Sequence, residues 1–472
     1  MSSTTRTERD SLGPLQVPAD AYYGVQTVRA VQNFPISGLR PLPEFVRAVT
    51  WIKKAAALTH KETGRLDAKL ADAIVAAADE VLAGKHEAHF VVDVYQAGAG
   101  TSHNMNCNEV LANRANELLG AMRGDYKPVH PNDHVNMAQS TNDVIPTAIR
   151  LGALDLLAPF GKAMEGLRDA FLAKGREFDD VIKAGRTHLQ DAMPIRLGQE
   201  FTAYGHTIDR NLARIRGAAD YLRDLGIGGS AVGTGVNVEP EYPGLMNKYL
   251  KQVTGLDLRV GADRFQLMQS LGDAAAFHAT IRVLALDLGK IANDIRLMVS
   301  GPRTGLDEIV LPAVQPGSSI MPGKVNPSMA EMVNQVCFQV IGNDACVSAA
   351  AEAGQLELNV MMPVIAHNVM FSMVILTNAV QAFTERCVTG ITANREQCEY
   401  WVERSAALAT ALAPKIGYAS AAEISKRSVK ENVLIRELVK REGDIPAAEI
   451  DDVLDLRKMT RIGVPGGKHG GE

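Results

Sequence analysis

Four short segments carry most of the side chains that suggest chemistry. Each is far more polar than its surroundings and stands where a helix is expected to begin or end. The segments are GAGTSHNMN at 98–106, HPNDHVN and QSTND within 130–143, GRTHLQD at 185–191 and GSSIMPGKVNP at 317–327. They are rich in hydroxyls and carboxamides, with few carboxylates and a lone lysine. Such a set of hydrogen-bond donors favours an anionic ligand.

Each segment also has a purely structural interpretation. Ser140, Thr141 and Asn142 fit a helix cap. The pair 187–188 fits a turn, and 317–327 fits a flexible loop. For one segment alone the two interpretations are evenly matched, but four donor-rich segments in one helical protein favour function.

Long helices are expected to position these segments. Apolar residues between 281 and 298 recur at intervals of three and four, which predicts one helix over 263–300. Similar stripes predict helices that include 160–171 and 201–222, and two more at about 328–352 and 360–392. Five such helices indicate an elongated bundle. Because some are apolar on several sides, we expect other subunits to cover them; one large monomeric bundle is the alternative.

The remaining sequence is more mixed, and we expect three domains. Residues 1–141 form a mixed, mostly helical domain, residues 142–395 the central long-helix bundle, and residues 396–472 a small C-terminal helical domain. In the first domain, helices are predicted at about 44–62, 66–83 and 105–120.

Composition excludes several classes of protein. The chain has 472 residues, 46% of them hydrophobic and 22% charged, with a net charge of −5. These values exclude bulk disorder and a strongly basic nucleic-acid footprint. Five cysteines without a C-x-x-C pair indicate a reduced protein. The polar N-terminus and the lack of eighteen consecutive uncharged apolar residues predict a soluble, cytoplasmic protein with neither a membrane nor a nucleic-acid partner.

Three sequence patterns resemble cofactor-binding or metal-binding motifs, but none matches its motif closely. Gly317–Lys324 differs from a phosphate-binding loop in its glycine spacing and in Val325, where that loop needs Ser or Thr. The glycine-rich segment Gly226–Gly235 follows a helical segment without a βαβ frame, so a flexible or tight loop is expected. The eleven histidines show no zinc-binding spacing. We therefore predict no cofactor-binding or metal-binding residues.

The loop at 317–327 closely resembles the signature loop of the aspartase/fumarase superfamily of lyases, and the similarity extends from about Arg6 to the C-terminal region. The resemblance implies a mainly all-α, three-domain fold with a central five-helix bundle and a tetrameric helical core. Within the superfamily, 92–102, 139–142 and 333–338 resemble the aspartate ammonia-lyases. Gln26 and the stretch 228–235 are closer to fumarases.

The resemblance implies a lyase that reversibly deaminates L-aspartate to fumarate and ammonia. The β-proton is abstracted through an enediolate (aci-carboxylate) intermediate. The alternative is a fumarate hydratase that converts fumarate to L-malate. A catalytically silent structural or binding relative is a remote alternative, which the intact Ser318, Lys324, Asn326 and His188 disfavour.

The resemblance also assigns the site residues. Ser318 is the general base, which must act as an alkoxide because a free alcohol is too weak a base; His188 as a helper base stays open. The catalytic residues are Ser318, His188 and Lys324. The substrate-binding residues are Thr101, Ser140, Thr141 and Ser319 for the β-carboxylate, Thr187, Lys324 and Asn326 for the α-carboxylate, and Asn142 with His188 for the amine.

The resemblance further implies a homotetramer in which three subunits build each site. No organic cofactor is expected because the substrate's own carboxylate serves as the electron sink. Mg²⁺ activates some relatives, but no cluster of ligands predicts it in this sequence.

Overall fold

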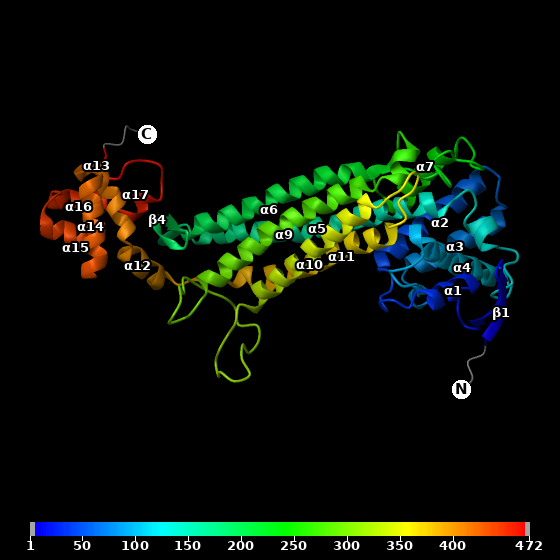
Figure 1. Ribbon diagram of the computed structural model, residues 1–472, viewed down its shortest axis with the longest axis horizontal. Helices are drawn as coiled ribbons and strands as arrows, with labels where there is room; N and C mark the ends of the chain where they lie inside the picture. The colour runs from blue at the N-terminus through cyan, green and yellow to red at the C-terminus, as the bar shows by residue number, and fades with distance from the viewer. Residues whose placement is uncertain (1–4, 468–472) are drawn as a thin grey trace. The chain divides into compact units, whose positions relative to one another are not determined.

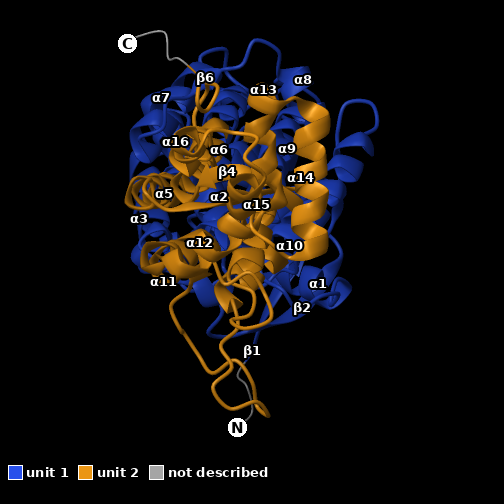
Figure 2. Cartoon of the chain, turned by 90° about the vertical axis from the view of Figure 1, so that its left-hand side faces the viewer, with its two compact units in different colours: residues 1–162, 211–286, 336–377 blue, residues 163–210, 287–335, 378–472 orange. Residues whose placement is uncertain are grey.

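The computed structural model describes residues 5–467. The chain falls into two compact units, which Figure 2 shows in different colours. Unit 1 comprises Met1–Lys162, Asn211–Leu286 and Val336–Thr377, and unit 2 comprises Ala163–Arg210, Asp287–Gln335 and Asn378–Glu472. The division into three consecutive domains stays a prediction.

The described residues contain 17 α-helices and four two-stranded sheets, so the prediction of a mainly α protein is confirmed. The five long helices are α5 (Thr141–Glu177), α6 (Leu197–Ala219), α9 (Gly272–Met298), α10 (Ser328–Glu352) and α11 (Met362–Arg386) (Figure 1). The expectation of one helix over 263–300 is wrong. Residues Arg264–Gln269 form a separate helix, α8, because Ser270 adopts extended backbone and its Oγ accepts from the Gly272 N–H at the start of α9.

In unit 1, segments of the long helices are joined by a buried polar cluster. His278 in α9 contacts Asp344 of α10 through Nδ1 at 2.9 Å and Ser372 of α11 through Nε2 at 2.8 Å. Ser372 also accepts from the Asn343 side chain at 2.9 Å. Because these polar atoms satisfy one another, three helices pack closely without an unpaired buried group among them.

The rest of unit 1 consists of shorter elements. Its helices are α1 (Val25–Asn33), α2 (Pro43–Glu62), α3 (Ala68–Leu82), α4 (Thr101–Leu118) and α7 (Tyr242–Thr254), and its strands are β1 (Thr5–Asp10) and β2 (Gly13–Pro18), which pair antiparallel, with β5 (Asp224–Leu225) and β6 (Arg259–Val260), which pair parallel. Buried Glu109 of α4 accepts from the backbone N–H groups of Gly24, Gln26 and Thr27. This carboxylate caps the start of α1, and burial raises its pKa to about 7.

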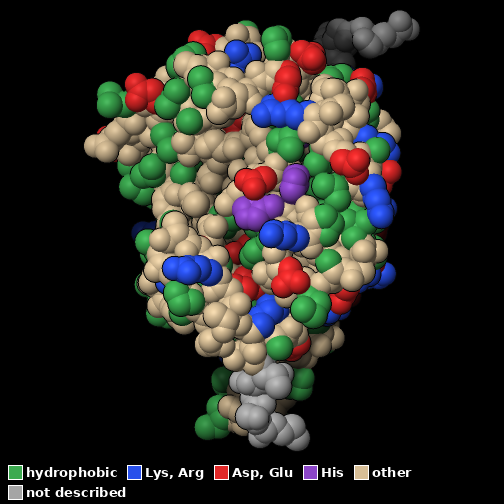
Figure 3. All heavy atoms as spheres, turned by 90° about the vertical axis from the view of Figure 1, so that its right-hand side faces the viewer, with side chains coloured by type: hydrophobic (Ala, Val, Ile, Leu, Met, Phe, Trp, Pro, Cys, Tyr) green, Lys and Arg blue, Asp and Glu red, His purple; other side chains and the backbone are tan. Residues whose placement is uncertain are grey.

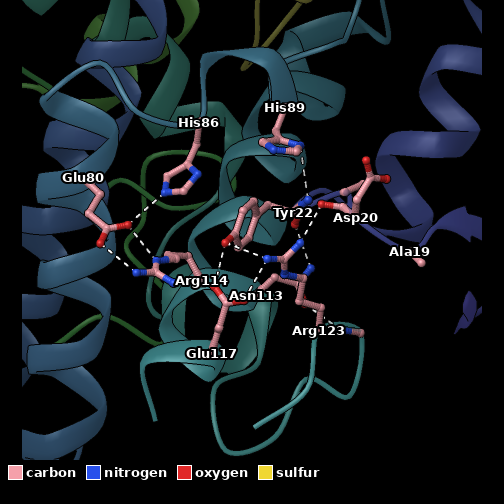
Figure 4. A network of polar contacts seen from close by, with 12 residues as sticks. Ala19, Asp20, Tyr22, Glu80, His86, His89, Asn113, Arg114, Glu117 and Arg123 are labelled. Atoms are coloured by element: carbon pink, nitrogen blue, oxygen red, sulfur yellow. Dashed lines mark hydrogen bonds and ion pairs between the residues drawn. The ribbon is translucent and has the colours of Figure 1, made fainter. Parts of the chain in front are cut away.

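A polar network holds the chain that leads into α1 (Figure 4). Tyr22 donates its hydroxyl to Glu117 at 2.6 Å, and its backbone N–H donates to Nδ1 of His89 at 3.3 Å. The Arg123 guanidinium lies over the Tyr22 ring, 3.9 Å from its centroid. A space-filling view of one face likewise shows histidines among acidic and basic side chains (Figure 3). These contacts fix the entry to α1, which lines the cavity described below.

Unit 2 has an aromatic core among segments of its long helices. The ring of Phe171 in α5 packs against Phe201 and Tyr204 of α6 and Phe383 of α11, and the Tyr204 hydroxyl donates to Asp294 of α9 at 2.9 Å. The C-terminal helices are α12 (Arg395–Arg404), α13 (Ala413–Ile416), α14 (Tyr418–Glu431), α15 (Ile435–Glu442), α16 (Ala447–Val453) and α17 (Leu456–Met459), and the strands are β3 (Ile182–Thr187) with β4 (Gln190–Arg196) and β7 (Ile309–Val310) with β8 (Thr392–Ala393).

Two helical segments, Thr141–Glu177 and Met362–Gly390, are long and apolar enough to cross a membrane by length and composition. However, 78% and 61% of their most apolar windows are buried inside the structure. Buried core helices of a bundle pass the same test, so these segments are weak evidence for membrane insertion.

Candidate active site

The first predicted donor, Thr101, stands at the N-terminus of α4. The helix begins there, earlier than the predicted start at 105, because Ala99 and Gly100 adopt left-handed backbone with φ of 62° and 87°. A Cβ on Gly100 would lie 3.0 Å from Ile145, so glycine also permits close packing against α5. Thr101 is exposed at the N-terminal end of this helix, where the helix dipole favours negative charge.

Ser140, Thr141 and Asn142 form the turn that starts α5. The Ser140 Oγ accepts from the Asn142 N–H at 3.2 Å, so the predicted capping role is present in the structure. Asn104, one turn after Thr101 in α4, donates to the Thr141 Oγ1 at 3.3 Å. The starts of α4 and α5 are thus joined, which brings the unit 1 donors to one region.

Behind this turn lie two buried ionisable side chains that the sequence analysis missed. Lys53 of α2 is fully buried and donates to the side-chain oxygens of Asn136 at 2.8 Å and Gln139 at 2.9 Å. Asp143 is also fully buried and accepts from the Ser140 N–H at 2.9 Å. Burial lowers the pKa of Lys53 to about 7 and raises that of Asp143 to about 6. A lysine inside the apolar run AVTWIKKAAAL was the one available signal.

A cavity of about 540 Å³ opens beside Thr101 in unit 1. Its lining combines polar and apolar side chains, and Thr101 is the one predicted donor among them; Ser140, Thr141 and Asn142 do not line it. This volume is ample for a four-carbon dicarboxylate.

Thr187 and His188 lie at the β3–β4 hairpin of unit 2. Thr187 pairs with Gln190, and the two turn residues between them, His188 and Leu189, have φ of 56° and 58°. Two positive φ angles define the turn that suits a two-residue hairpin, usually built from Asn and Gly. Neither residue here is Asn or Gly, so the turn stores backbone strain that is typical of functional sites. Both Thr187 and His188 are exposed.

A buried carboxylate anchors this hairpin. Glu308 is completely buried and forms ion pairs with Lys183 and Arg186 of β3, each at 2.8 Å. The hairpin tip is therefore presented from a firmly held base.

The loop at 317–327 is closed by its own hydrogen bonds. The Gly317 N–H donates to the Lys324 carbonyl at 2.8 Å, and the Asn326 side-chain NH₂ donates to the Gly317 carbonyl at 2.7 Å. The Ser318 Oγ accepts from the backbone N–H of Met321 at 2.8 Å and of Ile320 at 3.2 Å. Two such donors favour a negatively charged oxygen over a neutral hydroxyl.

Lys324 lies on the same loop and is exposed. Within residues 5–467, its ammonium group takes part in no hydrogen bond or ion pair. Asn326, by contrast, uses one N–H of its side-chain NH₂ group to close the loop, which leaves the second N–H and the side-chain oxygen for other contacts. A free cation and a donor-stabilised serine therefore share one loop.

The predicted site residues fall into two groups. Unit 1 contains Thr101, Ser140, Thr141 and Asn142, and unit 2 contains Thr187, His188, Ser318, Ser319, Lys324 and Asn326. In the described part of unit 2, no hydrogen bond joins the hairpin tip to the loop. No group of three or more His, Cys, Asp or Glu side chains within residues 5–467 is arranged to hold a metal ion.

A family model described as "Lyase" matches residues 13–342, and one described as "Fumarase C C-terminus" matches residues 408–461. The chain is 49% identical over 462 residues to the aspartate ammonia-lyase of Bacillus subtilis, covering 98% of this chain and 97% of that protein. It is 47% identical to the aspartate ammonia-lyase of Escherichia coli K12, covering 97% of each. It is also 52% identical to the class II fumarate hydratase of Halobacterium salinarum, covering 99% of each.

Solved structures show the same fold. A fumarate lyase:delta crystallin from Brucella melitensis bound to cobalt has a TM-score of 0.94 at 49% identity and covers 97% of this chain and 100% of that one. A class II fumarase from Schistosoma mansoni has a TM-score of 0.94 at 36% identity, covering 97% and 99%. The predicted mainly α fold of this superfamily and the predicted likeness to aspartate ammonia-lyases are confirmed. The chain belongs to the aspartase/fumarase superfamily of lyases.

Proposed function

We propose that this chain catalyses the reversible deamination of L-aspartate to fumarate and ammonia. Several relatives that are 45–49% identical over nearly the whole chain are aspartate ammonia-lyases. The structural observation that carries the proposal is the loop at 317–327. It combines a serine oxygen that accepts two backbone N–H groups with a free lysine.

The chemical difficulty is the weak acidity of the β-proton. Its removal places a second negative charge on the adjacent carboxylate, so the site must stabilise an enediolate dianion. In this proposal Thr101, Ser140, Thr141 and Ser319 donate hydrogen bonds to that carboxylate. Neutral hydroxyls supply these donors without adding a competing ion. The helix ends at Thr101 and Thr141 add backbone dipoles of the same sign.

Ser318 acts as the general base in its alkoxide form. The Ile320 and Met321 N–H groups stabilise that anion, and the Lys324 ammonium on the same loop favours it further. Lys324 holds the α-carboxylate as a point charge, with Thr187 and Asn326 beside it. His188 and Asn142 contact the amine, and His188 serves as the alternative base.

The active assembly is a homotetramer in which three subunits contribute to each site. Large apolar side chains remain exposed on the long helices, including Leu286 at 48%, Leu297 at 40% and Phe338 at 65%. Helices from other copies would cover these side chains. We further propose a cytoplasmic location, and the reaction as written needs no organic cofactor.

The assembly is tested by light scattering at micromolar concentration, which should give about four times 50.7 kDa. Mixing two inactive variants, His188→Ala and Ser318→Ala, should partly restore activity, because a hybrid tetramer contains sites in which both residues are intact. A stable, fully active monomer would contradict both parts of the proposal.

Fumarate hydratase is the second candidate, favoured by the relative that is 52% identical. Two assays separate the two activities. Formation of fumarate from L-aspartate is followed by ultraviolet absorbance with ammonia measured in parallel. Protein is then incubated with fumarate, with and without ammonium, and the product is identified. Aspartate formed only with ammonium supports the proposal, and malate as the main product contradicts it.

A further inference from the structure

The side chain of Asn142 has a fixed polarity. It is half-buried at the start of α5, and its Nδ2 donates to the backbone carbonyl of Ala231 at 2.8 Å. Because a carbonyl oxygen can only accept, the carboxamide must turn its nitrogen toward Ala231 and its oxygen away. Within residues 5–467 no hydrogen bond uses that oxygen. Asn142 therefore offers one free acceptor beside the hydroxyls of Ser140 and Thr141.

Ala231 belongs to the glycine-rich loop Gly226–Gly235, which is tight rather than flexible. The N–H groups of Gly233 and Gly235 both donate to the Gly229 carbonyl, at 2.9 and 3.1 Å. Gly233 has φ of 109°, and a Cβ there would lie 2.7 Å from the Phe265 ring. The loop thus needs glycine for both its backbone conformation and its close packing.

Asp143 ties this loop to the start of α5. Its Oδ2 accepts from the backbone N–H groups of Gly228 and Ser230, both at 3.0 Å, and its Oδ1 accepts from Ser140 N–H at 2.9 Å. The carboxylate is fully buried, so these bonds are shielded from water. It is adjacent to Asn142 in the chain, and both side chains bond to the loop. Asn142 is thereby held between two segments whose relative position Asp143 sets.

We propose that Asp143 and the glycine-rich loop together are a positioning device that presents the Asn142 oxygen to the departing amine of the substrate. This inference rests on the proposed function for its substrate. An acceptor without charge suits an ammonium or amino group, which has N–H to donate, and offers nothing to a carboxylate. Asp143 itself touches no substrate atom in this arrangement and acts only through Asn142.

The test compares a ligand that has the amine with one that lacks it. For Asp143→Asn, which turns one acceptor oxygen into a donor facing backbone N–H groups, we measure kcat/KM for L-aspartate and the inhibition constant of succinate. We expect kcat/KM to fall by about 10- to 100-fold, the range for losing a hydrogen bond to a charged group. The inhibition constant of succinate should rise by only a few-fold, through the Ser140 N–H that Asp143 also holds, because succinate has no amine to reach Asn142.

A second variant perturbs the loop without removing a polar group. Gly235 has φ of 70°, and a Cβ there would lie 2.9 Å from the Gly228 carbonyl. Gly235→Ala should therefore displace Gly228, whose N–H donates to Asp143. This variant should lower kcat/KM for L-aspartate by less than Asp143→Asn does, again with a smaller effect on the inhibition constant of succinate. It also tests the inference if Asp143→Asn does not fold. Gly244→Ala in α7 is the matched control, since nothing lies within 4 Å of its added Cβ.

Parallel losses for L-aspartate and succinate in both folded variants would overturn the inference, because the loop would then support the whole site rather than the amine contact. Unchanged kinetics in both variants would overturn it as well. The activity of the wild-type protein shows whether the inference or the proposed function has failed. If it hydrates fumarate and does not deaminate L-aspartate, the proposed function fails. The same variants are then compared with L-malate, whose hydroxyl also donates.

Discussion

The two groups of predicted site residues are held in different ways. In unit 1, the turn at 140–142 rests on buried side chains: Asp143 holds its backbone, and Lys53 holds the preceding Asn136 and Gln139. In unit 2, the loop at 317–327 is closed mainly by its own backbone and Asn326, and its tip is open, with Ile320 84% exposed.

This difference fits two separate roles, stabilisation of charge by unit 1 and proton abstraction by unit 2. Donors that stabilise a developing charge work best when they are preorganised and need not reorient during the reaction, which fits the buried support in unit 1. A base that must meet its substrate with water excluded can lie on a segment that closes, which fits the open loop in unit 2. Variants in the two regions should therefore separate catalysis from ground-state binding.

Ser318→Ala provides the sharpest test of this comparison and should have the largest effect. We expect kcat to fall by about 10²–10⁴-fold, the usual contribution of a positioned acid–base group. Binding of succinate should change little because the unit 1 hydroxyls remain. A loss of kcat with binding kept marks an interaction made chiefly in the transition state. Steady-state kinetics and succinate inhibition measure both quantities.

His188→Ala is the paired control for that assignment. If it abolishes turnover while Ser318→Ala keeps nearly normal kcat, the base is His188. If Ser318→Ala instead raises KM and leaves kcat intact, the serine only shapes the loop by capping the Ile320 and Met321 N–H groups. Either result would break the comparison between the two regions.

Lys324→Met should have the next largest effect, and on binding rather than on kcat alone. The ammonium is exposed and without a partner in the described residues, so its removal leaves no buried group unpaired and should leave the fold intact. We expect the affinity for L-aspartate and succinate to weaken by about 2–5 kcal/mol, the range for truncating one member of a buried charge pair in a complex. Unchanged succinate affinity, measured by calorimetry, would identify Lys324 as a solvated surface charge.

The elements that have a periodic sequence pattern were predictable from sequence. Apolar stripes at helical spacing located the five long helices, and the polar segments located the ends of α4 and α5. The break at Ser270 was missed because the stripe at 281–298 was extended back to 263, whereas the helix is interrupted by the extended backbone of Ser270 and its contact with the Gly272 N–H. Periodicity reports which face is buried, but not where backbone hydrogen bonding stops.

The supporting residues of the site were not predictable in the same way. Lys53 precedes Gln139 by 86 positions in the chain, and Asp143 meets Ser230 across 87, so only the tertiary structure brings them together. Nothing local distinguishes Lys53 from its neighbour Lys54, which lies partly exposed and pairs with Asp79. The chemistry of a polar loop can be inferred from its composition, but the buried groups that orient it depend on the fold.

Lys53→Met tests the preorganised side of the comparison, with the smallest effect. The variant leaves the Asn136 and Gln139 oxygens without their donor, so the free energy of unfolding at pH 9 should fall by about 1–3 kcal/mol. Succinate binding should weaken by a few-fold, which Ser318→Ala does not cause. Lys54→Met, which removes a partly exposed ion pair, is the matched control and should cost less than about 1 kcal/mol.

The stability difference between the wild-type protein and Lys53→Met should depend on pH, and the pKa of Lys53 fixes the direction of that dependence. Burial lowers the pKa of Lys53 to about 7, whereas the unfolded chain keeps its ordinary value of 10.5, so between these values the unfolded state binds more protons. Wild-type stability relative to Lys53→Met should therefore rise from pH 7 to pH 9, by about 2 kcal/mol. Chemical denaturation at several pH values measures this difference. A difference that stays constant would mean that Lys53 remains charged in the folded protein, and that charge rather than neutral hydrogen bonding supports the turn at 140–142.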